Sequence, residues 1–158
     1  MKYVPVLLSS VILCACQSAD SSDTAASKGP ATTIDVSGYP DFTAKADRSK
    51  VEEYWVKTTS KNPQYPMHAA LDGISGCVEI VYSINASGKP EGYRIVKAFP
   101  SGTFENNAMA ALARWRWKAS ETNIDKQPIL TSTQLDFVVS NSKNIDQARD
   151  ACGIEPIS

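Results

Sequence analysis

The four cysteines are the most reactive side chains of the chain, and their positions separate two kinds of chemistry. Cys14 and Cys16 close an apolar run near the start of the sequence, where a thiol can be acylated. Cys77 and Cys152 lie far downstream, where two thiols in an oxidising compartment form a disulfide. The first pair therefore concerns export and attachment, and the second concerns stability.

Residues Leu13-Cys14-Ala15-Cys16 resemble the lipobox, at which bacteria cut a secreted lipoprotein and acylate its cysteine. The apolar run 4–13 is too short for a membrane span, which needs about 20 residues as a helix. We therefore expect a signal peptide over residues 1–15 and lipid on Cys16. A cut before Cys14 would put bulky Leu13 beside the cleaved bond, where Ala15 fits better. The alternative is an ordinary cleaved signal peptide with an incidental cysteine.

Composition limits the remaining chain to one small domain. The sequence has 158 residues, and domains typically hold about 100 to 150. Hydrophobic residues make up 42% and charged residues 21%, as in ordinary soluble domains, and the formal net charge of -1 gives no electrostatic case for nucleic acid binding. We expect a flexible tether over 16–47, a domain over 48–140 and a C-terminal tail over 141–158. The tether is rich in Ser, Ala, Thr, Asp, Gly and Pro, and about 30 extended residues reach about 100 Å.

Hydrophobic spacing predicts the elements of this domain. Apolar residues three and four apart favour a short helix over 48–58. Strict alternation predicts strands over 77–84 and 93–98, which the turn residues 85–89 join into an antiparallel hairpin. A helix capped by Thr103 and a last strand ending near Val139 follow. We therefore expect an α+β fold: a small three-stranded antiparallel sheet with helices packed on one face.

Several short motifs occur in order over residues 62–139: Tyr65-Pro66 with Ala69-Ala70, the strand Gly76 to Ile84, Gly88 at the turn, and Phe104-Glu105 with Ala108, Ala111 and Trp115-Arg116-Trp117. In types and order, these motifs resemble those of the TonB C-terminal domain, the receptor-engaging periplasmic module of bacterial energy transducers. The resemblance implies the same α+β fold and a role in binding protein. Neither the transmembrane helix nor the long proline-rich spacer of a true transducer is expected here, so only the docking half of the family's activity carries over.

The last strand is the expected docking edge. A terminal strand exposes unpaired backbone groups that an extended peptide can satisfy, and we take Gln134, Asp136 and Val138 as the partner-binding residues. A disulfide between Cys77 and Cys152 would fold the tail across the sheet's other face and gate this edge. Two unpaired thiols remain the alternative.

No constellation in the sequence predicts an enzyme, a metal site or a cofactor. His68 is the single histidine, and the carboxylates show no paired spacing. Arg114-Trp115-Arg116-Trp117 could form a cation–π surface, but Trp115 continues the apolar face of the preceding helix. We therefore expect both tryptophans in the core.

The sequence favours a noncatalytic, lipid-anchored periplasmic module that docks an extended peptide. Gln17 behind Cys16 resembles the pattern that sends lipoproteins to the outer membrane, so we expect the protein on that membrane's periplasmic side. Its partner would be a receptor peptide or another envelope protein, and the resemblance implies a link to outer-membrane receptor transport. The alternative is a structural lipoprotein that scaffolds an envelope assembly or forms a homodimer.

We predict that Cys16 carries the lipid. Metabolic labelling with a fatty acid should mark the wild-type protein and miss Cys16→Ser, because acylation needs that thiol. The unlabelled variant should also leave the membrane fraction. Equal labelling of the two proteins would contradict the assignment.

Overall fold

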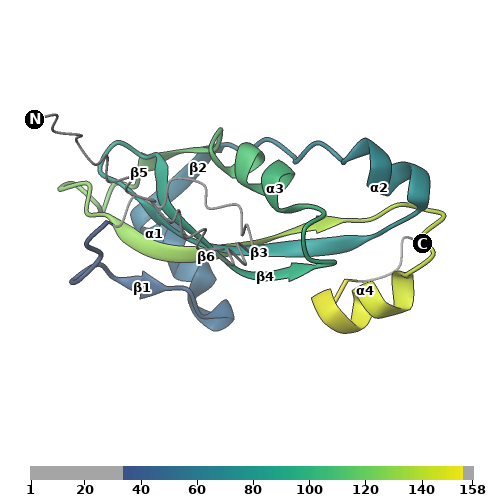
Figure 1. Ribbon diagram of the computed structural model, residues 1–158. Coiled ribbons are helices and arrows are strands. Elements are labelled where there is room, and N and C mark those ends of the chain that lie inside the picture. The colour runs from purple at the N-terminus through teal and green to yellow at the C-terminus, as the bar shows by residue number, and fades with distance from the viewer. Residues whose placement is uncertain (1–33, 155–158) are drawn as a thin grey trace, which may run out of the picture.

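The computed structural model describes residues 34–154, so the predicted signal peptide and Cys16 lie outside the described residues. The elements, shown in Figure 1, are β1 (Asp41–Phe42), the 3-10 helix η1 (Lys45–Lys50), α1 (Val51–Tyr54), β2 (Trp55–Thr59), α2 (Met67–Asp72), β3 (Gly76–Ile84), β4 (Pro90–Phe99), α3 (Glu105–Leu112), β5 (Arg116–Ala119), β6 (Ile129–Phe137) and α4 (Ile145–Cys152). None of the helices within 34–154 is long and apolar enough to cross a membrane.

Three long antiparallel strands form the centre of the sheet. Its order is β1-β6-β3-β4, and β2 and β5 form a separate two-stranded sheet. The predicted α+β class and the predicted hairpin of β3 and β4 are confirmed. The sheet has one strand more than predicted, because β1 pairs in parallel with Leu130 and Thr131 of β6.

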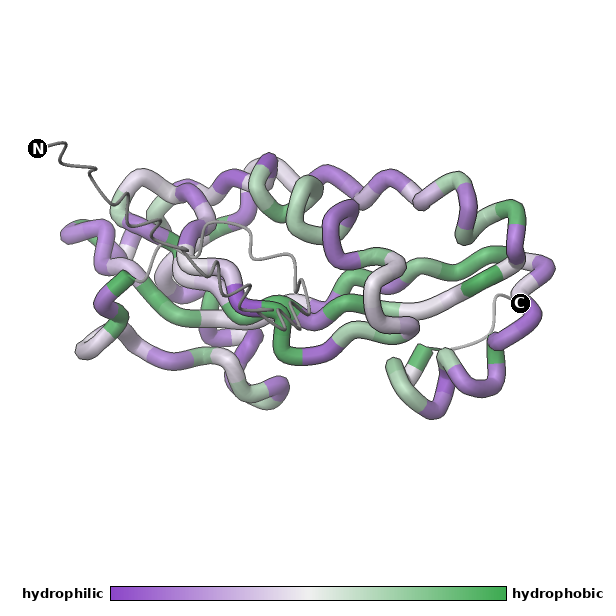
Figure 2. The backbone as a smooth tube through the Cα atoms, viewed as in Figure 1, coloured by the Kyte–Doolittle hydropathy of each residue, from purple (hydrophilic) through white to green (hydrophobic). Residues whose placement is uncertain are grey.

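The main core lies between this sheet and α2, α3 and the loop before α2. Alternate residues of β3 face it and are buried, as the alternation predicts: Val78, Ile80, Tyr82 and Ile84. Phe104 stacks on Phe137 with ring centroids 4.3 Å apart, and Tyr65 meets both rings edge-on. Figure 2 shows the resulting apolar stretches along the central strands. Trp115 and Trp117 are each 6% exposed, so their predicted place in the core is confirmed.

The helix predicted over 48–58 is wrong in its second half. The helical residues end at Tyr54, and Trp55–Thr59 form β2, which pairs antiparallel with β5. Aromatic and β-branched residues dominate this stretch and favour a strand once a partner is available. The indole N–H of Trp55 also donates to the carbonyl of Gln127 at 2.9 Å, which fixes the strand against the loop before β6.

Helices cover both faces of the sheet, which corrects the expected one-sided packing. In Figure 1, α2 and α3 lie above the long strands, whereas α4 lies below them. The predicted tail therefore contains a helix, whose Ala148 and Cys152 pack around Cys77 on the second face. The expected tether is also too long at its C-terminal end, because β1 and the first residues of η1 belong to the folded domain.

The predicted N-cap of α3 is wrong, whereas the predicted turn at Gly88 is present. Thr103 does not cap α3, because the structure puts Phe104 at its N-cap without a side-chain bond, and the carboxylate of Glu105 accepts from the N–H groups of Gly102 and Phe104. At the predicted turn, Gly88 has a φ of +69°, and an added Cβ would lie 2.0 Å from the carbonyl oxygen of Trp117. Only glycine fits there.

We predict that Trp115→Ala lowers the free energy of unfolding by about 3 to 5 kcal/mol, since it empties a buried site. It also removes an indole N–H that donates to the carbonyl of Lys61 at 2.9 Å. Met67→Ala is the control, because Met67 is 78% exposed. Denaturant midpoints measure the difference, and a midpoint equal to that of the control would place Trp115 at the surface.

Candidate functional site

The two lateral edges of the sheet differ in regularity. β4 begins at Pro90 and its pairing with β3 is interrupted by two register shifts, and it carries the exposed charges of Arg94 and Lys97. Bulges, proline and charge are the features that stop a strand from pairing with another chain. β6 instead pairs with β3 without interruption from Ile129 to Phe137. The β6 side is therefore the edge able to accept a further strand.

The outer backbone groups of β6 can be assigned from one hydrogen bond. The N–H of Leu130 donates to the carbonyl of Pro40 at 2.9 Å, on the side away from β3. Since successive residues of a strand alternate in direction, the backbone groups of Gln134 and Asp136 face the same side. Among residues 34–154, no strand pairs with β6 there. β1 covers only the beginning of the outer edge of β6, at Leu130 and Thr131. Within the described chain, Gln134–Phe137 have no strand beside them on that side, and we call these residues the open stretch of β6.

Two of the three predicted partner-binding residues lie on this open stretch. The side-chain amide of Gln134 donates to the carboxylate of Asp136 at 2.8 Å and to the carbonyl of Cys152 at 2.9 Å. Val138 lies beyond the end of β6, and its half-buried side chain packs against the α4 cluster. Val138 thus also packs against α4, and the role of all three residues in binding stays a prediction.

α4 forms one wall beside the open stretch. The structure joins Cys77 to Cys152, as predicted, with Cα atoms 5.9 Å apart. Asn144 adds a second attachment: its side-chain oxygen accepts from the N–H of Ser75 at 2.8 Å, and its amide donates to the carbonyl of Ser75 at 2.9 Å. The amide thus pairs with Ser75 as a peptide group would. Sequence reasoning missed Asn144, whose position just before a helix was the available signal.

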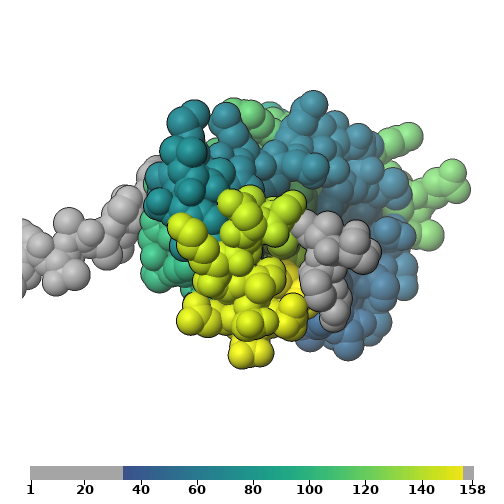
Figure 3. Space-filling view, turned by 90° about the vertical axis from the view of Figure 1, so that its right-hand side faces the viewer, coloured from purple at the N-terminus to yellow at the C-terminus, as the bar shows by residue number. Residues whose placement is uncertain are grey.

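η1 forms the opposite wall. The guanidinium of Arg48 donates to the hydroxyl of Ser132 at 3.0 Å and forms an ion pair with Glu79. A groove of about 460 Å³ lies between η1 and α4 over the second face, and we call it the η1–α4 groove. Its exposed charges are those of Lys45, Lys97 and Asp150. Figure 3 looks at the end of the molecule where α4, in yellow, stands below the teal and blue segments.

The tryptophans of the predicted cation–π motif do meet a cation, but a different one. The ammonium of Lys57 lies 3.9 Å from the ring centroid of Trp115. Burial lowers the pKa of Lys57, and the neighbouring Glu52 opposes that shift. Arg116 instead donates to the carbonyls of Ala113 and Trp115, just beyond the end of α3.

Burial also raises the pKa of Tyr82, which lies in the core beside Trp117.

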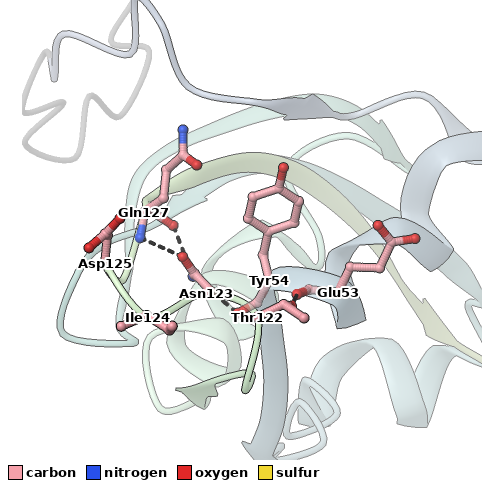
Figure 4. A pocket seen from close by; sticks show the side chains of 7 residues that line it. All are labelled: Glu53, Tyr54, Thr122, Asn123, Ile124, Asp125 and Gln127. Atoms are coloured by element: carbon pink, nitrogen blue, oxygen red, sulfur yellow. Dashed lines mark hydrogen bonds between the residues drawn. The ribbon is translucent and has the colours of Figure 1, made fainter.

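A second hollow, of about 570 Å³, lies beside the loop between β5 and β6 (Figure 4). Asn123 bridges its walls: the side-chain amide donates to the carbonyls of Tyr54 and Gln127, and the side-chain oxygen accepts from the N–H of Gln127. Thr122 donates to the carbonyl of Glu53. Because these polar groups bond one another, we interpret them as a brace for the loop.

The described part of the chain was predicted to hold no metal site, and the arrangement of its possible ligands bears on that prediction. No group of three His, Cys, Asp or Glu residues within 34–154 is placed to hold a metal ion. His68 is exposed on α2. Backbone pairing at the open stretch of β6 is the chemistry that this arrangement offers.

Comparison with known proteins points to one family. Residues 61–139 match the sequence model of the family described as Gram-negative bacterial TonB protein C-terminal. Protein TonB of Yersinia enterocolitica is 36% identical over 64 residues, which cover 40% of this chain and 25% of that protein. Protein TonB of Salmonella typhimurium is 32% identical over 66 residues, which cover 41% and 27%. The chain thus spans about a quarter of the length of these relatives. The solution NMR structure of the Pseudomonas aeruginosa TonB C-terminal domain superposes with a TM-score of 0.49 at 19% identity, over 65% of this chain and 96% of that one.

We predict that the double variant Cys77→Ala/Cys152→Ala lowers the free energy of unfolding by about 2 to 4 kcal/mol. The bond closes a sequence separation of 75 residues, and the chain-entropy model gives about 4 kcal/mol for such a ring as an upper figure. Denaturant titration measures the loss of unfolding free energy. The rate of amide hydrogen exchange should rise most in α4. Exchange in α3 serves as the internal control. Two thiols that alkylate without reductant in wild-type protein would contradict the bond.

Proposed function

The chain belongs to the family of Gram-negative bacterial TonB C-terminal domains, and from this we propose that it is a lipid-anchored envelope protein that docks an extended peptide. The peptide adds as a strand to the open stretch of β6. One observation carries the proposal: the outward backbone groups of Gln134 and Asp136 continue a regular ladder and have no strand partner among residues 34–154. Strand addition satisfies such groups, and nearby side chains give selectivity.

The anchor and the location rest on the sequence. Leu13-Cys14-Ala15-Cys16 supports acylation of Cys16, and Gln17 supports transfer to the outer membrane. We place the domain on the periplasmic side of that membrane, where its partner is an outer-membrane receptor or another envelope protein. Because the chain matches about a quarter of each relative, we propose only the docking step for it and not the transmission of energy.

The absence of catalysis is part of the proposal. His68 is exposed on α2, and the carboxylate of Glu79 is engaged by Arg48. The groups that remain near the open stretch are backbone amides, carbonyls and solvated charges. They suit the recognition of a polypeptide and not bond cleavage.

Self-association is the second candidate, favoured by the same regular edge. Two copies related by a twofold axis can pair their β6 edges with each other, because an antiparallel pair of identical strands is self-complementary. This candidate predicts a mass that doubles with concentration in the absence of any partner. Peptide docking predicts a monomer under the same conditions.

We predict that Asp136→Pro abolishes partner binding without unfolding the domain. Proline removes the outward N–H of residue 136, whereas the ladder between β6 and β3 uses the residues on either side. Asp136→Ala is the matched control, because it removes the same carboxylate and keeps the N–H. Photo-crosslinking in intact envelopes should recover the partner with wild type and Asp136→Ala only.

Thermal unfolding of the three proteins is measured alongside. A folded Asp136→Pro variant that still recovers the same partner would show that docking uses another surface. A variant that unfolds is replaced by N-methylation of the same amide in protein made by chemical ligation, which removes the donor without the proline ring.

A further inference from the structure

A segment of the chain itself already lies on the edge to which we assign docking. Asp41 and Phe42 of β1 pair with Leu130 and Thr131 of β6. The carbonyl of Pro40 accepts the outward N–H of Leu130, and the carbonyl of Thr43 accepts from the hydroxyl of Ser132 at 2.8 Å. β1 thus occupies the beginning of the edge, directly before the open stretch.

The attachment of β1 is slight compared with that of the other strands. It pairs over two positions, whereas β3 and β6 pair over nine. The chain then turns away through a hydrogen bond of 2.8 Å from the N–H of Thr43 to the carboxylate of Asp41. A longer strand on the same edge would also reach the backbone groups of Gln134 and Asp136. It would therefore form more main-chain bonds than β1 does.

The side chains of β1 show what the edge accepts. β1 runs parallel to β6, and its two side chains point to opposite faces. Phe42 lies on the core side, half-buried against the main core, with its ring centroid 5.3 Å from that of Tyr54. Asp41 is exposed on the other side. The edge thus offers an apolar site at the position opposite Thr131 and solvent at the position before it.

We propose that β1 is an internal ligand of the β6 edge, and that a partner peptide binds by displacing it. The partner strand runs parallel to β6, seats a large apolar side chain where Phe42 lies, and extends along Gln134 and Asp136. This inference rests on the proposed function, since it names the competitor and the chemistry of the same docking edge. Wild-type affinity is then reduced by the fraction of molecules in which β1 is seated.

The experiment uses a defined probe, a fluorescent synthetic peptide with the sequence of residues 38–45. Its binding is measured to the full chain in detergent as wild type, Phe42→Ala and the control Met67→Ala, whose side chain is exposed on α2. If β1 is seated in most wild-type molecules, Phe42→Ala binds the peptide about ten-fold more tightly than the other two proteins. A peptide with alanine in place of Phe42 loses this binding. Hydrogen exchange at Leu130 becomes faster in Phe42→Ala and slows again when the peptide is added.

Equal affinity in the three proteins, or no binding to Phe42→Ala, overturns the inference. If thermal unfolding shows that Phe42→Ala does not fold, Asp41→Ala replaces it under the same criterion, because it loses only the turn bond to Thr43. The outcome is separable from that of the envelope crosslinking. If Asp136→Pro loses its crosslinks but Phe42→Ala does not bind the peptide, only the internal-ligand proposal is rejected. If Phe42→Ala binds the peptide but Asp136→Pro keeps its crosslinks, only the proposed docking function is rejected.

Discussion

Burial of β3 on both faces and along both edges is the constraint on which the rest of the structure depends. Eight of its nine residues are buried, and Glu79 is half-buried. Strands β4 and β6 take its two edges, and the main core takes one face. The packing leaves no room at its start, because a Cβ on Gly76 would lie 1.7 Å from the carbonyl oxygen of Phe99. The neighbouring strands β4 and β6 and the helix α4 are positioned by their contacts with this strand.

The second face of β3 connects the core to the candidate site. Cys77 and Glu79 are successive residues on that face, and each holds a segment that is distant in sequence: Cys77 holds α4 through the disulfide, and Glu79 holds η1 through Arg48. These two segments are the walls of the η1–α4 groove. The ion pair is partly solvated and contributes little by itself, whereas the disulfide is buried among apolar side chains. The α4 wall is therefore the more firmly attached of the two.

The sequence was informative where one periodicity extended over a long element and ambiguous where several short ones met. Alternation from Val78 to Ile84 predicted β3, and the apolar face from Phe104 to Leu112 predicted α3. The stretch around Trp55 fits helical spacing equally well, and only its pairing with β5 decides for a strand. β1 has two residues, too few for any periodic signal. The Cys77 and Cys152 pairing was predicted, but the bracing by Asn144 and Arg48 depends on contacts across more than 30 positions, which no local pattern records.

The contrast between the two edges of the sheet sets a limit on assembly. When a partner strand pairs with β6, that partner strand becomes the outermost strand on its side of the sheet. On the other side of the sheet, the register shifts and exposed charges of β4 disfavour the pairing of a second added strand. Growth by repeated edge-to-edge pairing of strands, the route to fibres, needs two receptive edges on each copy. Through these edges the domain can thus form a complex of fixed, small stoichiometry, and crowding many copies onto one surface would raise the occupancy of that complex without starting a polymer.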